Sequence, residues 1–274
     1  MSIDYILIFL AGLGGGFLAG LLGIGGGVIY ILILPLALRE VGVPELEIAQ
    51  HVIANSIFGT MAASLFASIT LIRDKDFYWK EVLIVGASGV VVSYLLLFLF
   101  VNTPYYSERT FNIAVIVFLI LILFTSFNKS KYQLLFNKPV KNEKAWHIFT
   151  GGTAGAMAAL SGLGGGTVVV PLLKSGMHMD IKRAKSISLG VILITSTLMT
   201  VFNMLDNPAQ PYSGSSIGYI VMPVAIPLSL GVVVSSPFGV KVSHKISSRI
   251  ISYIFAGFLL LVIVRKSIAL IQIF

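Results

Sequence analysis

Two glycine clusters lie inside apolar stretches of the chain, where an uninterrupted helix would otherwise be expected. The first is "GIGGG", residues 23–27, and the second is "GLGGG", residues 162–166. Glycine is about 1 kcal/mol worse than alanine inside a helix, so each cluster predicts a break after which a new helix begins. The free N–H groups at that new N-terminus and its positive dipole end favour an anion, and glycine lets the anion come close. The predicted chemistry is the binding of a small anion.

Further polar residues beside these clusters complete the candidate site. The segments after the clusters, "AQHVIANSIFGT" (49–60) and "AKSISLGVILIT" (184–195), offer amides, an imidazole, an ammonium and several hydroxyls. Strongly polar groups are costly in a membrane and often mark a transport pathway, whereas serine and threonine can bond their own helix. The residues predicted to bind substrate are Gly25, Gly26, Gly27, Gln50, His51, Asn55, Ser56, Ser161, Gly164, Gly165, Gly166, Thr167, Lys185, Ser186 and Ser188.

Each candidate also has a purely structural interpretation. The glycines could permit tight helix packing, as small residues do in membranes. His51 could be an interfacial residue near the end of a span, and Lys185 could extend along its helix towards water. Neither cluster is followed by the Lys-Ser/Thr pair of a phosphate loop. The absence of cysteine excludes disulfides and thiolate metal sites, no His-Glu-x-x-His set is present, and we expect neither an enzyme nor a cofactor or metal.

Composition places the chain in a lipid bilayer. Of its 274 residues 57% are hydrophobic and only 11% are charged, whereas soluble proteins are typically about half apolar and a quarter charged. Ile48–Ile72 contains no Asp, Glu, Lys or Arg, and similar runs occupy 82–101, 110–127, 186–205, 217–240 and 250–264. About 20 apolar residues span a bilayer, so we predict an all-α polytopic membrane protein. The net charge of +8 then indicates basic cytoplasmic loops rather than nucleic-acid binding.

The chain matches itself in two places. A shift of 139 positions aligns "GFLAGLLGIGGG" (16–27) with "GAMAALSGLGGG" (155–166), and a shift of 142 aligns "GVVVS" at 89–93 with "GVVVS" at 231–235. These matches predict two related halves, 1–127 and 147–274, each a glycine-broken segment followed by three spans. The polar, basic stretch 128–146 is the predicted linker between them.

The basic residues of the loops indicate how the glycine-broken segments cross the membrane. If all eight apolar segments cross once, Lys and Arg divide nine to ten between the two sides. If the two glycine-broken segments turn back, they divide fifteen to four, which is the bias that membrane proteins ordinarily show. We therefore predict two helical hairpins, re-entrant or short-legged, that enter from opposite faces, and two inverted repeats. The linker would be cytoplasmic and both termini would lie on the outer side.

These residues resemble the sulfite exporter TauE/SafE family, also called toluene sulfonate uptake permeases. The resemblance rests on Ala19–Gly27 leading to Pro35, on Ala158–Gly166 leading to Pro171, and on the helices that open at Ala49 and Ala184. One departure is that "AQHVIANS" stands where relatives often have a small Gly-Thr-Ser type string. The resemblance implies transport of a small sulfur-containing anion such as sulfite, thiosulfate or an organosulfonate.

The predicted function is accordingly a secondary transporter in a bacterial inner membrane that binds its anion between the two glycine clusters near the midplane. Inverted repeats with interrupted helices at matching positions are typical of such transporters. The alternatives are an anion channel and a permease for a non-sulfur organic anion. All acidic residues fall in loops or near span ends, so proton coupling would have to use His51 or the substrate itself. The direction of transport, the coupling ion and the oligomeric state are left open.

Overall fold

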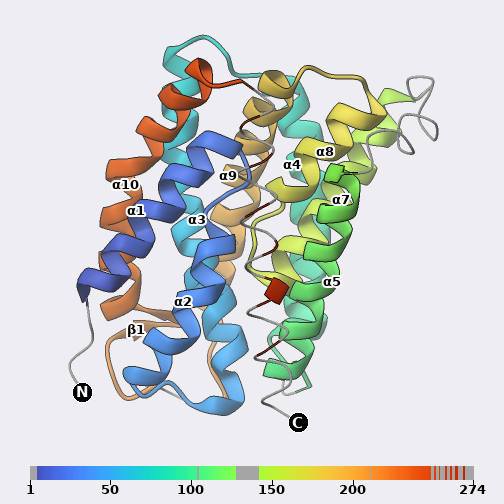
Figure 1. Cartoon of the computed structure of the whole chain (residues 1–274). Helices are drawn as coiled ribbons and strands as arrows, with labels where there is room; N and C mark the ends of the chain where they lie inside the picture. The colour runs from blue at the N-terminus through green and yellow to red at the C-terminus, as the bar shows by residue number, and fades with distance from the viewer. Residues whose placement is uncertain are drawn as a thin grey trace.

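The computed structural model describes residues 5–103, 105–127, 142–210 and 212–247, together with isolated residues between 250 and 268. The described chain forms a bundle of helices (Figure 1). Its elements in chain order are α1 (Tyr5–Leu22), α2 (Gly27–Glu40), η1 (Glu45–Glu47), α3 (Ile48–Arg73), α4 (Trp79–Leu96), η2 (Leu97–Val101), α5 (Glu108–Phe127), α7 (Glu143–Ser161), α8 (Gly166–Gly176), α9 (Ile181–Leu205), β1 (Ser216–Ile217), β2 (Ile220–Val221) and α10 (Met222–Lys245).

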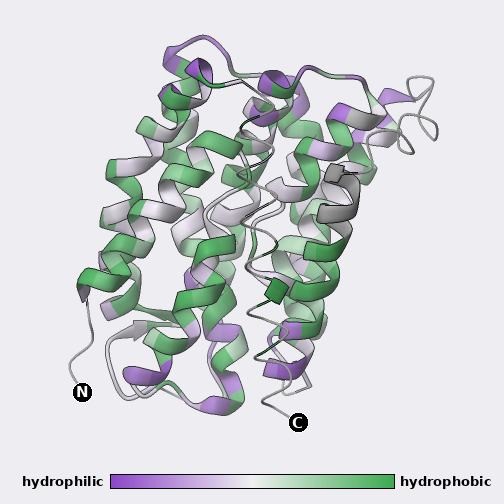
Figure 2. Cartoon of the chain, in the orientation of Figure 1, coloured by the Kyte–Doolittle hydropathy of each residue, from purple (hydrophilic) through white to green (hydrophobic). Residues whose placement is uncertain are grey.

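The all-α membrane architecture predicted from composition is confirmed. Within the described ranges, five helical stretches are long and apolar enough to cross a membrane: Tyr5–Leu22, Glu45–Arg73, Trp79–Val101, Ile181–Leu205 and Met222–Lys245. Figure 2 shows apolar residues along the middle of the bundle and hydrophilic ones at its two ends. Most of the linker, and all but isolated residues of the last predicted span, lie outside the described residues.

Both glycine clusters reverse the direction of the chain. α1 and α2 form one hairpin and α7 and α8 form a second, and in Figure 1 the two hairpins open towards opposite ends of the bundle. The reversal needs left-handed backbone, which glycine adopts without strain: φ is +72° at Gly23 and +78° at Gly25, and +64° at Gly162 and +73° at Gly164. The second legs are short, because the 11 residues of α8 rise only about 16 Å. We call residues 23–27 and 162–166 the first and second glycine turns.

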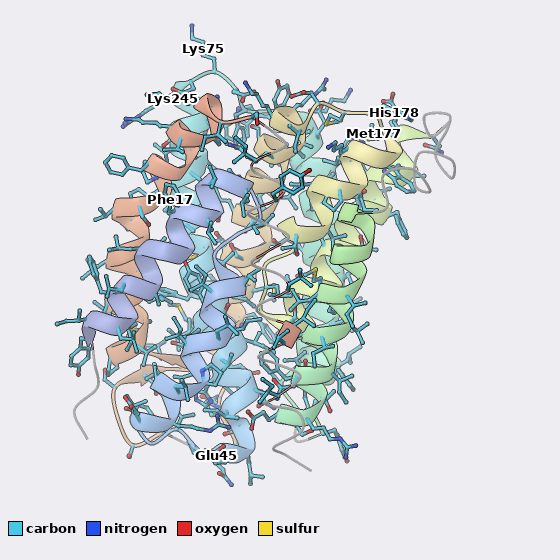
Figure 3. The ribbon with its side chains drawn as sticks, in the orientation of Figure 1. Phe17, Glu45, Lys75, Met177, His178 and Lys245 are labelled. Atoms are coloured by element: carbon cyan, nitrogen blue, oxygen red, sulfur yellow. The ribbon has the colours of Figure 1, made fainter. Side chains whose placement is uncertain are left out.

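The loops lie where the hairpin prediction puts them. In Figure 3, Lys75, His178 and Lys245 lie at one end of the bundle and Glu45 lies at the other. The segments after the two hairpins, which contain Glu45 and His178, are therefore at opposite ends. The basic loops before α4 and after α10 share the end of His178, as the fifteen-to-four division requires.

The first helix of each predicted half packs against a helix of the other half. α1 packs along α10 and α7 packs along α4. Both contacts use glycine: a Cβ on Gly12 would lie 3.0 Å from the carbonyl carbon of Leu228, and a Cβ on Gly155 would lie 2.9 Å from the carbonyl carbon of Gly89. The helix backbones touch directly, as small residues allow in membranes. Each half therefore covers the first helix of the other.

The span expected at 217–240 has other bounds in the structure: it is α10, which begins only at Met222 and runs to Lys245. Residues 216–221 instead form the two-stranded β1–β2 turn, where Gly218 has a φ of +56°. Pro223 stands in the first turn of α10, which fits a helix start. α7 begins at Glu143, so the last four residues of the segment predicted as linker are helical.

Candidate anion site

The two glycine turns meet tip to tip. A Cβ on Gly27 would lie 2.6 Å from the carbonyl oxygen of Leu163, and a Cβ on Gly166 would lie 2.7 Å from the carbonyl oxygen of Gly23. Both distances are far below ordinary contact, so only hydrogen fits at either position. The two halves of the chain thus touch through backbone where α2 and α8 begin.

Two buried serines join the turns across the halves. Ser56 of α3 donates a hydrogen bond of 2.6 Å to the carbonyl oxygen of Gly162, and Ser188 of α9 donates one of 2.6 Å to the carbonyl oxygen of Gly23. Neither side chain is exposed. Each serine lies in the helix that follows one hairpin and bonds the turn of the other hairpin. Both were predicted site residues, and the structure places both at the junction.

Backbone N–H groups at the junction are unsatisfied. Within the described residues, the N–H groups of residues 24–28 and 164–167 make no hydrogen bond. The first N–H groups of α2 and α8 are in this set, because a helix N-terminus has no partner for them inside the helix. No side chain caps either helix. Two helix N-termini with free donors and positive dipole ends therefore face one another.

Two hydroxyls that lie against the glycine turns also have no partner within the described part of the chain. They belong to Tyr30 of α2 and Thr60 of α3, neither of which is exposed. Thr60 was noted among the polar residues after the first cluster but was not a predicted site residue, and Tyr30 was missed. The available signal was a tyrosine three residues after a glycine cluster in an otherwise apolar run.

A buried ammonium lies beside the first glycine turn. The aliphatic stem of Lys185 packs against Gly23, and its Nζ donates to the hydroxyl of Ser243. Lys185 is only 7% exposed, and the described residues place no carboxylate within ion-pair distance of it. The expectation that Lys185 could extend to water is therefore wrong. Its neighbour Ser186 bonds the carbonyl of Asp76 in the loop before α4.

Four predicted residues face their own hairpin instead of the junction. Ser161 donates to the carbonyl of Met157 at 2.6 Å, and the Thr167 hydroxyl lies 3.1 Å from the Met157 sulfur. A Cβ on Gly26 would meet the Tyr30 ring, and one on Gly165 would lie 2.6 Å from the side chain of Ala154. Gly25 and Gly164 do face the junction, since the Thr60 side chain lies between them.

The side-chain amides of Gln50 and Asn55 in α3 form hydrogen bonds with the backbone of neighbouring loops. Asn55 donates to the carbonyl of Tyr219 at 3.1 Å and accepts from the N–H of Val221 at 3.0 Å, which fixes the β1–β2 turn. Gln50 donates to the carbonyl of Tyr106 at 2.9 Å. The bonds of Gln50 and Asn55 therefore join α3 to the loop after η2 and to the β1–β2 turn.

His51 is fully buried next to these amides. Its Nδ1 lies 3.0 Å from the carbonyl oxygen of Glu47, and its ring meets the Tyr219 ring edge-on at 5.1 Å. Its Nε2 has no hydrogen-bond partner in the described structure. His51 therefore lies near the end of its span, as expected, but is enclosed by protein.

Metal and hydrolase chemistry find no support in the described residues. No group of three His, Cys, Asp or Glu side chains could hold a metal ion there. The string "GSSIG" (214–218) does match the Gly-x-Ser-x-Gly pattern of serine hydrolases. Its Ser216 lies in the two-residue strand β1 instead of at a strand-to-helix turn, so the match lacks the geometry of a nucleophile.

Fold and site together define a polytopic helical membrane protein with two helix N-termini facing each other inside the bundle. Comparison with known proteins gives its family: the chain belongs to the sulfite exporter TauE/SafE family, whose model matches residues 8–266. This confirms the resemblance noted in the sequence and makes the chain a member of a family of membrane transporters.

Two curated relatives are similar over nearly their whole length. A probable membrane transporter protein of Methanocaldococcus jannaschii is 28% identical over 243 residues, which cover 89% of this chain and 88% of the relative. A probable membrane transporter protein of Haemophilus influenzae is 25% identical over 267 residues, covering 95% and 97%. No solved structure matches the chain.

Proposed function

We propose that this protein is a secondary transporter for a small sulfur-containing anion, such as sulfite, thiosulfate or an organosulfonate, and that the anion binds where the two glycine turns meet. The observation that supports this is the set of unsatisfied N–H groups at the two facing helix N-termini. A hydrogen bond to a charged group contributes about 1.5–3 kcal/mol. Three or four of them would offset the cost of holding a small ion and leave micromolar to millimolar affinity.

The charges near the junction favour an anion over a cation. Lys185 is a buried cationic residue whose aliphatic stem packs on the first glycine turn and whose Nζ donates to Ser243. The acidic residues of the described chain lie in loops or at helix ends. A cation such as Na⁺ would face donors and an ammonium, whereas an anion is stabilised by both.

The two halves, 1–127 and 147–274, are proposed to be inverted repeats that move against each other around this site. Three observations support the relation: the hairpins open at opposite ends, the serine bonds are reciprocal, and α1 on α10 has its counterpart in α7 on α4. Transporters of this kind alternate access around a fixed midplane site. The basic end, with linker 128–146, is then cytoplasmic, and the termini lie outside a bacterial inner membrane.

Flux and binding measurements test the proposal. Purified protein in proteoliposomes should take up radiolabelled sulfite or thiosulfate, with a rate that saturates and with acceleration when unlabelled anion is present on the far side. An anion channel would show neither saturation at low concentration nor counter-transport. A permease for a non-sulfur anion would transport a carboxylate such as acetate and would ignore the sulfur anions. Absence of binding for every anion tested would refute the proposed function.

Proton coupling through His51 is a separate part of the proposal. A pH gradient across the vesicle membrane should drive uptake if a proton moves with the anion. His51→Gln keeps a hydrogen-bond donor next to the Glu47 carbonyl and removes the titrating ring. Unchanged response of this variant to the gradient would leave the substrate as the proton carrier.

A further inference from the structure

Two buried hydroxyls of the first half are left without a partner where the turns meet. Within the described ranges, Tyr30 and Thr60 are both fully buried and no acceptor or donor reaches either hydroxyl. Buried serines and threonines in helices usually bond a carbonyl one turn earlier, as Ser64 of the same helix does, although the buried Ser68 hydroxyl has no partner either. An unsatisfied buried hydroxyl is costly, and those of Tyr30 and Thr60 also lie against the glycine turns and their free N–H groups, which points to a ligand.

Thr60 lies between the two turns. Its Cγ2 is 2.9 Å from the position that a Cβ would take on Gly25, and also 2.9 Å from the position on Gly164. Its Oγ1 lies 3.7 Å and 3.8 Å from the same two positions. A group held between the turns would therefore contact the Thr60 hydroxyl and the free N–H groups of both halves.

Tyr30 occupies a niche made of glycine. A Cβ on Gly15 would lie 2.6 Å from the Cζ of Tyr30, one on Gly26 would lie 2.6 Å from its Cε2, and one on Gly59 would lie 3.0 Å from the same Cε2. The ring therefore needs glycine at all three positions. Gly26 belongs to the first glycine turn, so the ring packs directly on that turn.

The second half fills the corresponding niche with apolar side chains. At the shift of 139, Val169 matches Tyr30 and Ala154 matches Gly15. Val169 and Ala154 are both members of one buried hydrophobic cluster. Packing alone is satisfied there without a hydroxyl, so the tyrosine and its three glycines serve something other than packing.

Thr60 has an apolar counterpart as well. The shift of 132 that brings Ser56 onto Ser188 brings Thr60 onto Ile192. The counterpart occupies the related place in the structure, because the Cδ1 atom of Ile192 packs against Gly166 of the second glycine turn. Both unsatisfied hydroxyls thus come from the first half, and the matching positions of the second half are aliphatic.

We propose that the hydroxyls of Tyr30 and Thr60 determine which anion the site accepts, by donating to oxygen atoms gathered on one side of it. In the second half Ile192 packs against the glycine turn and offers no hydroxyl, so the donors on that side are the backbone N–H groups of the turn alone. This inference rests on the proposed function and adds a preference to it. An anion with an apolar face, such as a sulfonate with its alkyl group, satisfies both sides. Sulfate has oxygens in all four directions and leaves at least one of them against an aliphatic side chain.

Calorimetric titration of the purified protein with methanesulfonate and with sulfate tests the preference. The wild type should bind methanesulfonate at least tenfold more tightly than sulfate. Thr60→Val and Tyr30→Phe keep the shapes of the side chains and should each weaken methanesulfonate at least tenfold, with thermal stability unchanged or raised. Thr60→Ser retains the hydroxyl and should keep binding within threefold of the wild type.

Matched variants elsewhere separate the proposed role from a structural one. Thr195→Val removes a buried hydroxyl that already bonds the carbonyl of Val191 at 2.9 Å, so it should leave both affinities unchanged. Ile192→Thr places a hydroxyl on the apolar side and should raise the affinity for sulfate relative to methanesulfonate at least threefold.

One negative result would refute only the role of the two hydroxyls, and another would refute the proposed function. If the wild type binds both anions but Thr60→Val and Tyr30→Phe bind methanesulfonate as tightly as it does, the role of the hydroxyls is refuted and the proposed function stands. If the wild type binds no anion, the proposed function itself fails. Equal affinity of the wild type for sulfate and methanesulfonate would also overturn the one-sided preference.

Discussion

Replacing Gly27 with alanine tests the junction between the two glycine turns most directly. Gly27 is the first residue of α2 and its φ is not in the left-handed region, so alanine does not strain the backbone. By helix propensity alone alanine is better by about 1 kcal/mol. Its methyl, however, would lie 2.6 Å from the carbonyl carbon and oxygen of Leu163, where 3.4 Å is the start of ordinary contact. The carbonyl oxygen of Gly162 would be closer still, so the two turns would have to separate by at least about 0.8 Å.

That separation is large compared with a hydrogen bond. An N–H···O bond of about 2.9 Å lengthened by the same amount reaches roughly 3.7 Å and is lost. An anion held by both turns would then lose at least one charge-assisted bond, which is about 1.5–3 kcal/mol. Since 1.4 kcal/mol is a factor of ten, the dissociation constant should rise roughly ten- to hundredfold.

Titration calorimetry and vesicle uptake of the Gly27→Ala variant measure this loss. Gly152→Ala is the matched control, because Gly152 lies inside α7 and its nearest neighbour would be the Cγ2 of Val92 at 3.6 Å. The control should bind as the wild type does and be up to about 1 kcal/mol more stable. Wild-type affinity and uptake in Gly27→Ala would refute the idea that the anion binds between the turns.

Three further outcomes follow from described contacts. Ser56→Ala should lower stability by about 1–3 kcal/mol, seen in thermal unfolding, since the carbonyl of Gly162 loses its donor; unchanged unfolding would show that the bond contributes nothing. Asn55→Ala should release the β1–β2 turn and speed its proteolysis or hydrogen exchange, while equal protection in variant and wild type would contradict this role. Because the chain has no cysteine, Lys75→Cys and His178→Cys report sidedness cleanly: an impermeant maleimide should label both from the same side of sealed vesicles, and labelling from opposite sides would refute the hairpins.

The two hairpins could be predicted because the glycine clusters act locally and the loop charges can simply be summed. Glycine clusters break helices through their own backbone energetics, and loop charge is a sum over the chain that differs sharply between the two topologies. The meeting of Ser56 with Gly162 and of Ser188 with Gly23 was less accessible. The sequence marked these residues as polar or flexible, but which of them touch depends on how helices far apart in the chain cross.

The roles of individual polar side chains could not be predicted for the same reason. Gln50 and Asn55 were selected because an amide in a membrane is costly, and they are indeed buried, but the structure satisfies them with loop backbone. Tyr30 was missed because an aromatic residue in an apolar run is usually core. Its unsatisfied hydroxyl and its glycine niche become visible only when α1, α2 and α3 are placed together.

The exchange of helices between the halves also sets an order of assembly during synthesis. Gly89 and Gly151, where α4 meets α7, are 62 positions apart, whereas Gly12 and Leu228, where α1 meets α10, are 216 positions apart. At about 5–20 residues per second, a ribosome takes roughly 3–12 s over the first interval and roughly 10–45 s over the second. The glycine face of α1 therefore stays in lipid without its partner until most of the chain has been made. α1 is made before the other described helices, yet its glycine face is covered only after α10 has been made, so slow or interrupted translation exposes this face for longest.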